Sequence, residues 1–197
     1  MDHHDNRNDA EIVRLSGEEA TTCILDPERG LALLRDVLEK SIAQTEDRAR
    51  CSAFLAVSID NVQSITELFG DVVAEPVFGG LAARLKECLR TSDVIARMGH
   101  AQFGIVLPNF RFNGASVVLK RILALRAKPV LTHFGAIDLK LSVASVLFPD
   151  GHLSASDIIT RAQATLTFNQ NRREEPLQLT DAVRMRLKTL RSDALSI

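Results

Sequence analysis

The sequence predicts an α/β fold of the α+β sandwich kind, in which helices pack around a mixed central sheet. Two apolar segments, FLAVSI at residues 54–59 and LKLSVASVLF at residues 139–148, have the length and β-branched content of buried strands. Between them, VIARM and FGIVLP flank Gly99 and His100 as in a tight hairpin. Segments with apolar residues at helical spacing surround these strands, so helices are expected to cover the sheet.

The first helix is expected to begin near Pro27, because proline is favoured in a first helical turn, and to end at the polar stretch QTEDRAR. Its apolar residues recur at helical spacing, and these are Leu31, Leu34, Leu38 and Ile42. After the strand at residues 54–59, a short helix over residues 62–68 is expected to end at Gly70.

A longer helix follows, with Pro76 expected in its first turn. Gly79 and Gly80 lie inside this helix, where each glycine costs about 1 kcal/mol relative to alanine. Close packing against the sheet is the expected compensation. The apolar face of the helix is formed by Val73, Val77, Leu81, Leu85 and Cys88.

Two helices flank the strand at residues 139–148, which the turn Pro149-Asp150-Gly151 is expected to close. The earlier helix ends before Pro129. The apolar residues of these two helices are Val118, Ile122 and Leu125 in the first, and Ile158, Ile159, Ala162 and Leu166 in the second.

The chain divides into a flexible lead-in at residues 1–22, one domain at residues 23–180 and a C-terminal amphipathic helix at residues 181–197. PLQLT is a candidate final strand of the domain. The terminal helix carries one apolar stripe, which packs either onto its own domain or onto a partner. The stripe consists of Val183, Leu187, Leu190 and Ala194.

Composition narrows the range of partners. With 24 Lys and Arg against 25 Asp and Glu, the net charge of -1 offers no broad basic surface for nucleic acid. The three cysteines are widely spaced and are expected to be reduced core thiols, and the five histidines do not group into a metal site. Without a long apolar run or an apolar start, a cytoplasmic protein without membrane contact is expected.

Six short motifs in order, together with the sequence of strand, two helices and hairpin, resemble the GGDEF family of diguanylate cyclases. The resemblance covers most of residues 27–180 and implies a nucleotidyl-cyclase-like mixed sheet. The signature is degenerate, because GHAQF stands in place of GGDEF. The motifs are PER at 27–29, SIDN at 58–61, LFGD at 68–71, ARMGHAQF at 96–103, SVASVLFPDG at 142–151 and RAQATLTFNQ at 161–170.

The resemblance implies that the catalytic residues are replaced. A cyclase holds its nucleoside triphosphate through divalent cations, which require oxygen ligands. Ser58 and Ala101 stand at the two positions where the family has carboxylate ligands, so no bound Mg²⁺ is expected. His100 and Gln102 replace the second glycine and the second acid of the signature, and Gln170 replaces the phosphate-binding lysine. Because histidine tolerates positive φ, the hairpin is still expected to form.

Two further positions concern the guanine base. Thr66 stands where the family has its guanine-reading asparagine, and Glu75 where it has a guanine-binding aspartate. The resemblance therefore implies a residual guanine contact at Glu75 and Thr66.

Arg90 and Asp93 stand at the offset of the family's inhibitory R-x-x-D site, which binds the product cyclic-di-GMP. An arginine fork can pair with guanine or phosphate, and a carboxylate can accept from the guanine edge. Lys120 or Arg121 is expected to add a second cation. The alternative is a surface ion pair between Arg90 and Asp93, which is worth about 0 to 1 kcal/mol and has no function.

Three functions stay open at the level of the sequence. The first is a catalytically inactive cyclic-di-GMP receptor that uses the R-x-x-D site. The second is a nucleotide-independent scaffold that forms a homodimer or docks a signalling partner, such as a phosphodiesterase domain, through the terminal helix. The third is a residual diguanylate cyclase or a GTP-sensing domain that reads guanine through Glu75.

Overall fold

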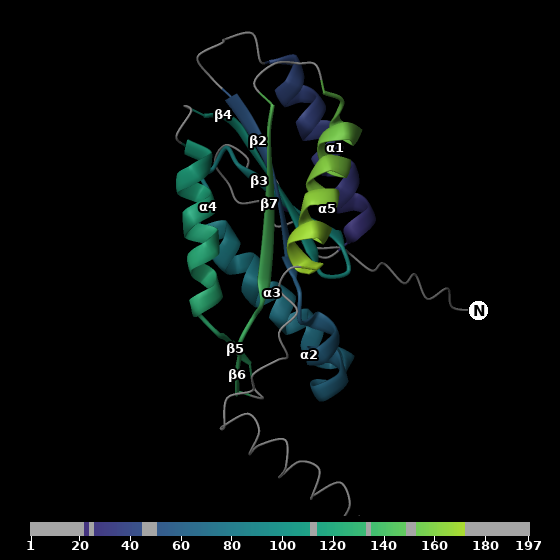
Figure 1. Cartoon of the computed structure of the whole chain (residues 1–197), viewed down its shortest axis with the longest axis vertical. Coiled ribbons are helices and arrows are strands. Elements are labelled where there is room, and N and C mark those ends of the chain that lie inside the picture. The colour runs from purple at the N-terminus through teal and green to yellow at the C-terminus, as the bar shows by residue number, and fades with distance from the viewer. Residues whose placement is uncertain are drawn as a thin grey trace, which may run out of the picture.

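A five-stranded mixed sheet organises the chain (Figure 1). A computed structural model describes residues 22–23, 26–44, 51–110, 114–132, 135–148 and 153–171. The strand order is β1-β3-β4-β2-β7, in which β1 runs parallel to β3 and all other neighbours are antiparallel. The strands are β1 (Thr22–Cys23), β2 (Cys51–Ile59), β3 (Val94–Gly99), β4 (Gln102–Phe110) and β7 (Leu141–Phe148).

Helices cover both faces of this sheet, which confirms the predicted fold class (Figure 1). One face packs against α1 (Pro27–Ala43) and α5 (Ala155–Asn171). The other packs against α2 (Val62–Phe69), α3 (Asp71–Glu87) and α4 (Gly114–Ala124). A 3₁₀ turn, Leu125–Ala127, extends α4 and leads into a small hairpin of β5 (Val130–Thr132) and β6 (Gly135–Ile137).

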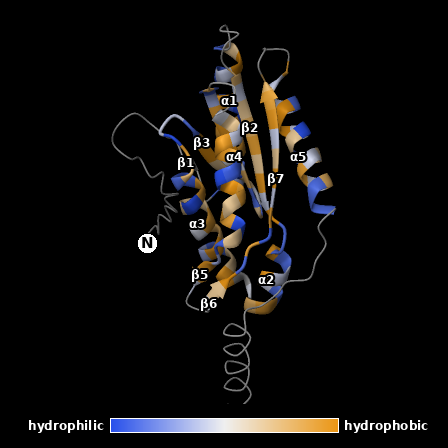
Figure 2. Cartoon of the chain, turned by 60° about the vertical axis from the view of Figure 1, so that its left-hand side comes forward, coloured by the Kyte–Doolittle hydropathy of each residue, from blue (hydrophilic) through white to orange (hydrophobic). Residues whose placement is uncertain are grey.

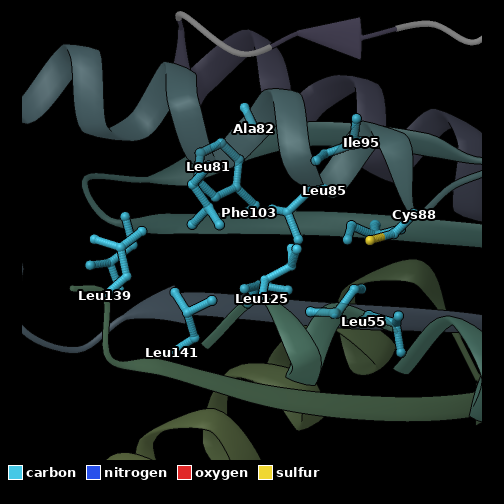
Figure 3. Close-up of a cluster of buried hydrophobic side chains, with 14 of the residues drawn as sticks. Leu55, Leu81, Ala82, Leu85, Cys88, Ile95, Phe103, Leu125, Leu139 and Leu141 are labelled. Atoms are coloured by element: carbon cyan, nitrogen blue, oxygen red, sulfur yellow. The ribbon is translucent and has the colours of Figure 1, made fainter. Parts of the chain in front are cut away.

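Strand β2, which lies between β4 and β7, is buried along its whole length, so both of its faces are largely apolar, and Figure 2 colours β2 and β7 as largely hydrophobic. Successive residues of β2 point alternately into two hydrophobic cores, one on each face of the sheet. Leu55 faces the core on the side of α3, to which Leu81, Leu85 and Phe103 also belong (Figure 3). Phe54 faces the core beneath α1 and α5.

Two glycines let α1 approach the sheet closely. A Cβ at Gly30 would overlap the carbonyl oxygen of Arg97 on β3, and one at Gly104 would overlap Leu34 of α1. The helix is well capped, because Asp26 Oδ1 accepts hydrogen bonds from the backbone N–H groups of Glu28 and Arg29 at 2.9 and 3.2 Å.

Two details of α3 differ from prediction. The helix begins at Asp71, directly after Gly70, whose φ of 80° ends α2 and lets the next helix begin at once. Pro76 therefore lies inside the helix and not in its first turn. Gly80 packs closely against Val130 of β5, as expected of a compensating contact, although the neighbour is the small hairpin and not the sheet. A Cβ added at Gly79 would have no neighbouring atom within 4 Å.

The sequence did not indicate β1, β5 or β6. Thr22, predicted to be the last residue of the lead-in, lies in β1 and pairs with Ile95 of β3. The turn at residues 149–151, the strand PLQLT and the C-terminal helix lie outside the described residues. Cys51 and Cys88 are buried free thiols, as predicted. Within the described ranges, no helix is both long and apolar enough to cross a bilayer.

Candidate functional site

The degenerate signature positions meet at one end of the sheet. Strand register places Ser58 of β2 opposite Gln102 of β4 and Ser142 of β7. The next residue, Ile59, donates its backbone N–H to the carbonyl oxygen of Ala101 at 3.0 Å. The β3–β4 hairpin therefore brings its tip to the end of β2, as the resemblance implied.

Gln170 reaches this corner from the last turn of α5. Its side-chain Nε2 donates to Ser58 Oγ at 2.8 Å and to Asp60 Oδ1 at 3.0 Å. The second oxygen of Asp60 accepts from Ser142 Oγ at 2.7 Å. Ser58 and Ser142 are buried, so these hydrogen bonds satisfy groups that would otherwise be costly to bury.

The donor set of this corner does not fit the divalent cations that the family implies. Ala101 has no side-chain ligand atom, and Ser58 offers a neutral hydroxyl where a carboxylate would be needed. Asp60 is the corner's carboxylate, and both of its oxygens already accept hydrogen bonds. In the part of the chain that the structure describes, no three His, Cys, Asp or Glu side chains group as metal ligands.

Arg97, the arginine of the ARMGHAQF motif, contacts several parts of the neighbouring hairpin, although the sequence analysis assigns it no role. Its side chain is only 6% exposed, and its Nη1 lies 2.9 and 3.1 Å from the two carboxylate oxygens of Glu75. Its Nε and Nη2 donate to the carbonyl oxygens of Gly99 at 3.2 Å and His100 at 2.9 Å. The guanidinium also lies over the ring of Phe78, 4.4 Å from the centroid.

This arrangement fixes the residues at the hairpin tip. The His100 ring packs edge-on against Phe78, with ring centroids 5.8 Å apart. Neither Gly99 nor His100 adopts positive φ, so the tolerance of histidine for that conformation is not needed. Glu75, the expected residual guanine contact, is paired with Arg97. Thr66 Oγ1 is buried and has no hydrogen-bond partner among the described residues.

The R-x-x-D segment forms a closed turn between α3 and β3. Asp93 Oδ2 accepts from the backbone N–H of Arg90 at 2.8 Å, and the Asp93 N–H donates back to the Arg90 carbonyl at 3.1 Å. Asp93 is only 5% exposed, and this burial raises the pKa of its carboxyl group. The backbone hydrogen bond from Arg90, the positive charge of Arg90 and a hydrogen bond from the Ser92 side chain each act in the opposite direction. Arg90 itself is exposed. The carboxylate therefore builds the turn while the guanidinium faces solvent.

Charged side chains of both signs lie near Cys88 at the end of α3, two residues before Arg90. Burial raises the pKa of the Cys88 thiol, the charge of Arg121 opposes that rise, the charge of Glu87 adds to it, and the charge of Lys128 opposes it. Arg121 on α4 and Lys128 after the 3₁₀ turn therefore lie within electrostatic range of Cys88. Lys120, the alternative second cation, is also exposed on α4. Lys128 is a member that sequence reasoning missed, since it precedes Pro129 in an irregular segment.

The fold and these positions define a protein of the nucleotidyl-cyclase-like class. The family model described as diguanylate cyclase, GGDEF domain, matches residues 30–175, so the chain belongs to the GGDEF family. Diguanylate cyclase DgcP of Pseudomonas aeruginosa is 26% identical over 76% of the chain, and uncharacterized protein YhcK of Bacillus subtilis is 28% identical over 50%. The chain spans only 23% and 28% of the lengths of these two relatives.

Solved structures show the same fold at low sequence identity. The GGDEF domain of PA1120 from Pseudomonas aeruginosa has a TM-score of 0.67 and 18% identity, with 76% of this chain and 96% of that one covered. Diguanylate cyclase SiaD of the same organism, solved with its activator SiaC, has a TM-score of 0.64 and 21% identity, with 72% and 54% covered. The GGDEF domain of DgcB from Caulobacter crescentus, solved with c-di-GMP, has a TM-score of 0.61 and 16% identity, with 69% and 81% covered.

Proposed function

We propose that this chain is a catalytically inactive GGDEF domain of cyclic-di-GMP signalling that binds the dinucleotide through Arg90 and its turn. The observation that carries the proposal is the contrast between two places in the fold. At the signature positions, the resemblance implies that Ser58, Ala101 and Gln170 replace charged residues of the family, whereas the R-x-x-D turn keeps both its arginine and its aspartate. The related DgcB domain was solved with c-di-GMP.

Electrostatics argue against turnover. A triphosphate at the corner of Ser58 and Asp60 would meet neither a metal nor the lysine that Gln170 replaces. Each unpaired negative charge would lack an attraction worth about 4 kcal/mol, which is the Coulomb energy of two unit charges 4 Å apart at an effective dielectric near 20. Guanine recognition at Glu75 would in addition have to compete with Arg97, which holds both carboxylate oxygens.

Electrostatics favour an anion at the R-x-x-D turn. Arg90 is exposed, and at the end of α3 the positive charges of Arg121 and Lys128 outnumber the negative charge of Glu87. An arginine beside other cations suits the phosphates and the guanine O6 and N7 of a cyclic dinucleotide. Asp93 holds the turn that presents Arg90, and for its buried carboxylate to accept from the guanine edge, as proposed, this turn would have to open.

Incubation with GTP and Mg²⁺ or Mn²⁺ tests the inactive half of the proposal. Chromatography of the nucleotides is expected to find no cyclic-di-GMP. The double variant Ser58→Asp with Ala101→Glu is also expected to be inactive, because His100, Thr66 and Gln170 remain. Turnover at an ordinary cyclase rate by the unaltered chain would refute this half.

Calorimetric titration of Arg90→Ala with cyclic-di-GMP tests the binding half. Loss of a charge-assisted bond worth roughly 1.5 to 3 kcal/mol predicts affinity weakened about tenfold or more. The matched control is Arg35→Ala, which removes an exposed arginine from α1 on the opposite face of the sheet. Equal affinity in both variants would place the ligand elsewhere.

A further inference from the structure

The last turn of α5 is attached to the sheet by two neighbouring side-chain amides. Asn169 Nδ2 donates to the backbone carbonyl of Val143 on β7 at 3.0 Å. Gln170 Nε2 donates to Ser58 Oγ and Asp60 Oδ1 at the end of β2. The Gln170 bonds join residues 112 and 110 positions apart in the chain, so they act between elements and not within one.

Asp60 is the charged centre of this attachment. Its two carboxylate oxygens accept from uncharged donors, the Gln170 amide on one side and the Ser142 hydroxyl on the other. A carboxylate held in this way is solvated by the protein without a cation. Any cation or ligand that used Asp60 Oδ1 would first have to displace the amide of Gln170.

We infer that Gln170 is a latch, whose neutral amide fastens the last turn of α5 to β2 by bridging Ser58 and Asp60. These bonds hold the corner together without a metal ion. They also fix the C-terminal end of α5, at Asn171, relative to β2. A ligand that took over Asp60 would release this turn, which couples the corner to the position of α5. This inference does not depend on cyclic-di-GMP binding.

Hydrogen exchange of the α5 amides in the full chain tests the latch. Gln170→Glu would place a second carboxylate against Asp60, and we expect protection of the last turn to fall at least about tenfold through local opening. The control is Gln163→Glu, which makes the same change on the same helix two turns earlier, away from Asp60. Equal losses of protection in the two variants would overturn the latch.

Gln170→Ala removes the amide without adding charge, so it remains informative if Gln170→Glu does not fold. Loss of the bridging bonds predicts a fall in last-turn protection of roughly three- to tenfold, while the middle of α5 changes less. Unchanged protection in this variant would overturn the proposal.

Manganese provides a readout that separates the latch from simple helix damage. Exchange in the unaltered chain is expected to be the same with and without Mn²⁺. In Gln170→Glu the two facing carboxylates and the hydroxyls of Ser58 and Ser142 form an oxygen-rich site, so Mn²⁺ is expected to restore protection. A response of the unaltered chain, or no restoration in the variant, would contradict the geometry of the latch.

Discussion

Arg97 connects several parts of the site through one side chain. Its guanidinium holds Glu75, two hairpin carbonyls and the face of Phe78 while only 6% of the side chain is exposed. The two partners contribute unequally, because the Glu75 side chain is 61% exposed and its pair with Arg97 is partly screened by water. Arg97 is therefore the buried partner of this ion pair, and Glu75 is the exposed one.

This asymmetry predicts the outcome of two substitutions. Arg97→Met should lower the free energy of unfolding by about 2 to 4 kcal/mol, because the Gly99 and His100 carbonyls lose charged donors. Glu75→Gln should lower it by about 1 kcal/mol or less. Urea denaturation of both variants measures the difference, and equal losses would mean that the carboxylate, not the hairpin, is the main partner of Arg97.

Asp93 and Asp157 should give stability opposite dependences on pH. Burial raises the pKa of Asp93, so its contribution to stability is present below the ordinary aspartate pKa of about 4 and is lost as pH rises through the raised value. The side-chain and backbone hydrogen bonds of Ser154 lower the pKa of Asp157. Its contribution is present above the ordinary value and is lost as pH falls through the lowered one.

Free energies of unfolding between pH 3 and 7 test this pair of dependences. The stability of the unaltered chain relative to Asp93→Asn should decrease as pH rises, and its stability relative to Asp157→Asn should increase. Each variant serves as the control for the other, since both exchange a carboxylate for an amide. Parallel pH profiles in the two comparisons would contradict the environments described for these residues.

At the scale of elements, helix α1 is held against the sheet by the absence of a side chain at Gly30, whereas Gly79 of α3 faces open space. Gly30→Ala should therefore destabilise the protein by more than about 1 kcal/mol, because its Cβ would overlap the Arg97 carbonyl. Gly79→Ala should stabilise it by about 0.5 to 1 kcal/mol through helix propensity. Thermal denaturation would show opposite shifts, and shifts of the same sign would rule out this account of the two contacts.

The longer elements were predictable because their apolar patterns extend over several turns or pleats. Each strand of the β5–β6 hairpin has three residues, too few to show a pattern. The start of α3 was misplaced because Pro76 resembles a first-turn proline, whereas the unusual backbone of Gly70 decides where the helix begins.

The candidate site was predictable only as a set of positions. Motif order assigns Ser58, Ala101 and Gln170 to the family's site positions, and in the structure Gln170 bonds to Ser58 while the Ala101 carbonyl accepts from the neighbouring Ile59. The partners themselves were not predictable, because Arg97 lies in an apolar strand and pairs with a residue 22 positions earlier. Motif order likewise gave no sign that the Asp93 carboxylate would bond to the Arg90 backbone.

At the scale of the whole molecule, the predicted helix at residues 181–197 decides between a receptor that acts alone and a scaffold. Its stripe around Leu187 lies outside the described residues, so its location stays a prediction. We expect Leu187→Glu either to convert a dimer into a folded monomer, as the scaffold requires, or to lower thermal stability at unchanged mass, as packing on its own domain requires. Light scattering and thermal denaturation of the same samples distinguish these outcomes.

Side-by-side calorimetry of the unaltered chain with cyclic-di-GMP and with GTP plus Mg²⁺ tests the central claim most directly. Gln170 is hydrogen-bonded to Ser58, and Glu75 is paired with Arg97, whereas Arg90 is exposed. We therefore predict saturable binding of cyclic-di-GMP and no binding of GTP. Binding of GTP alone, or of neither nucleotide, would contradict the account of an inactive domain that retains product recognition.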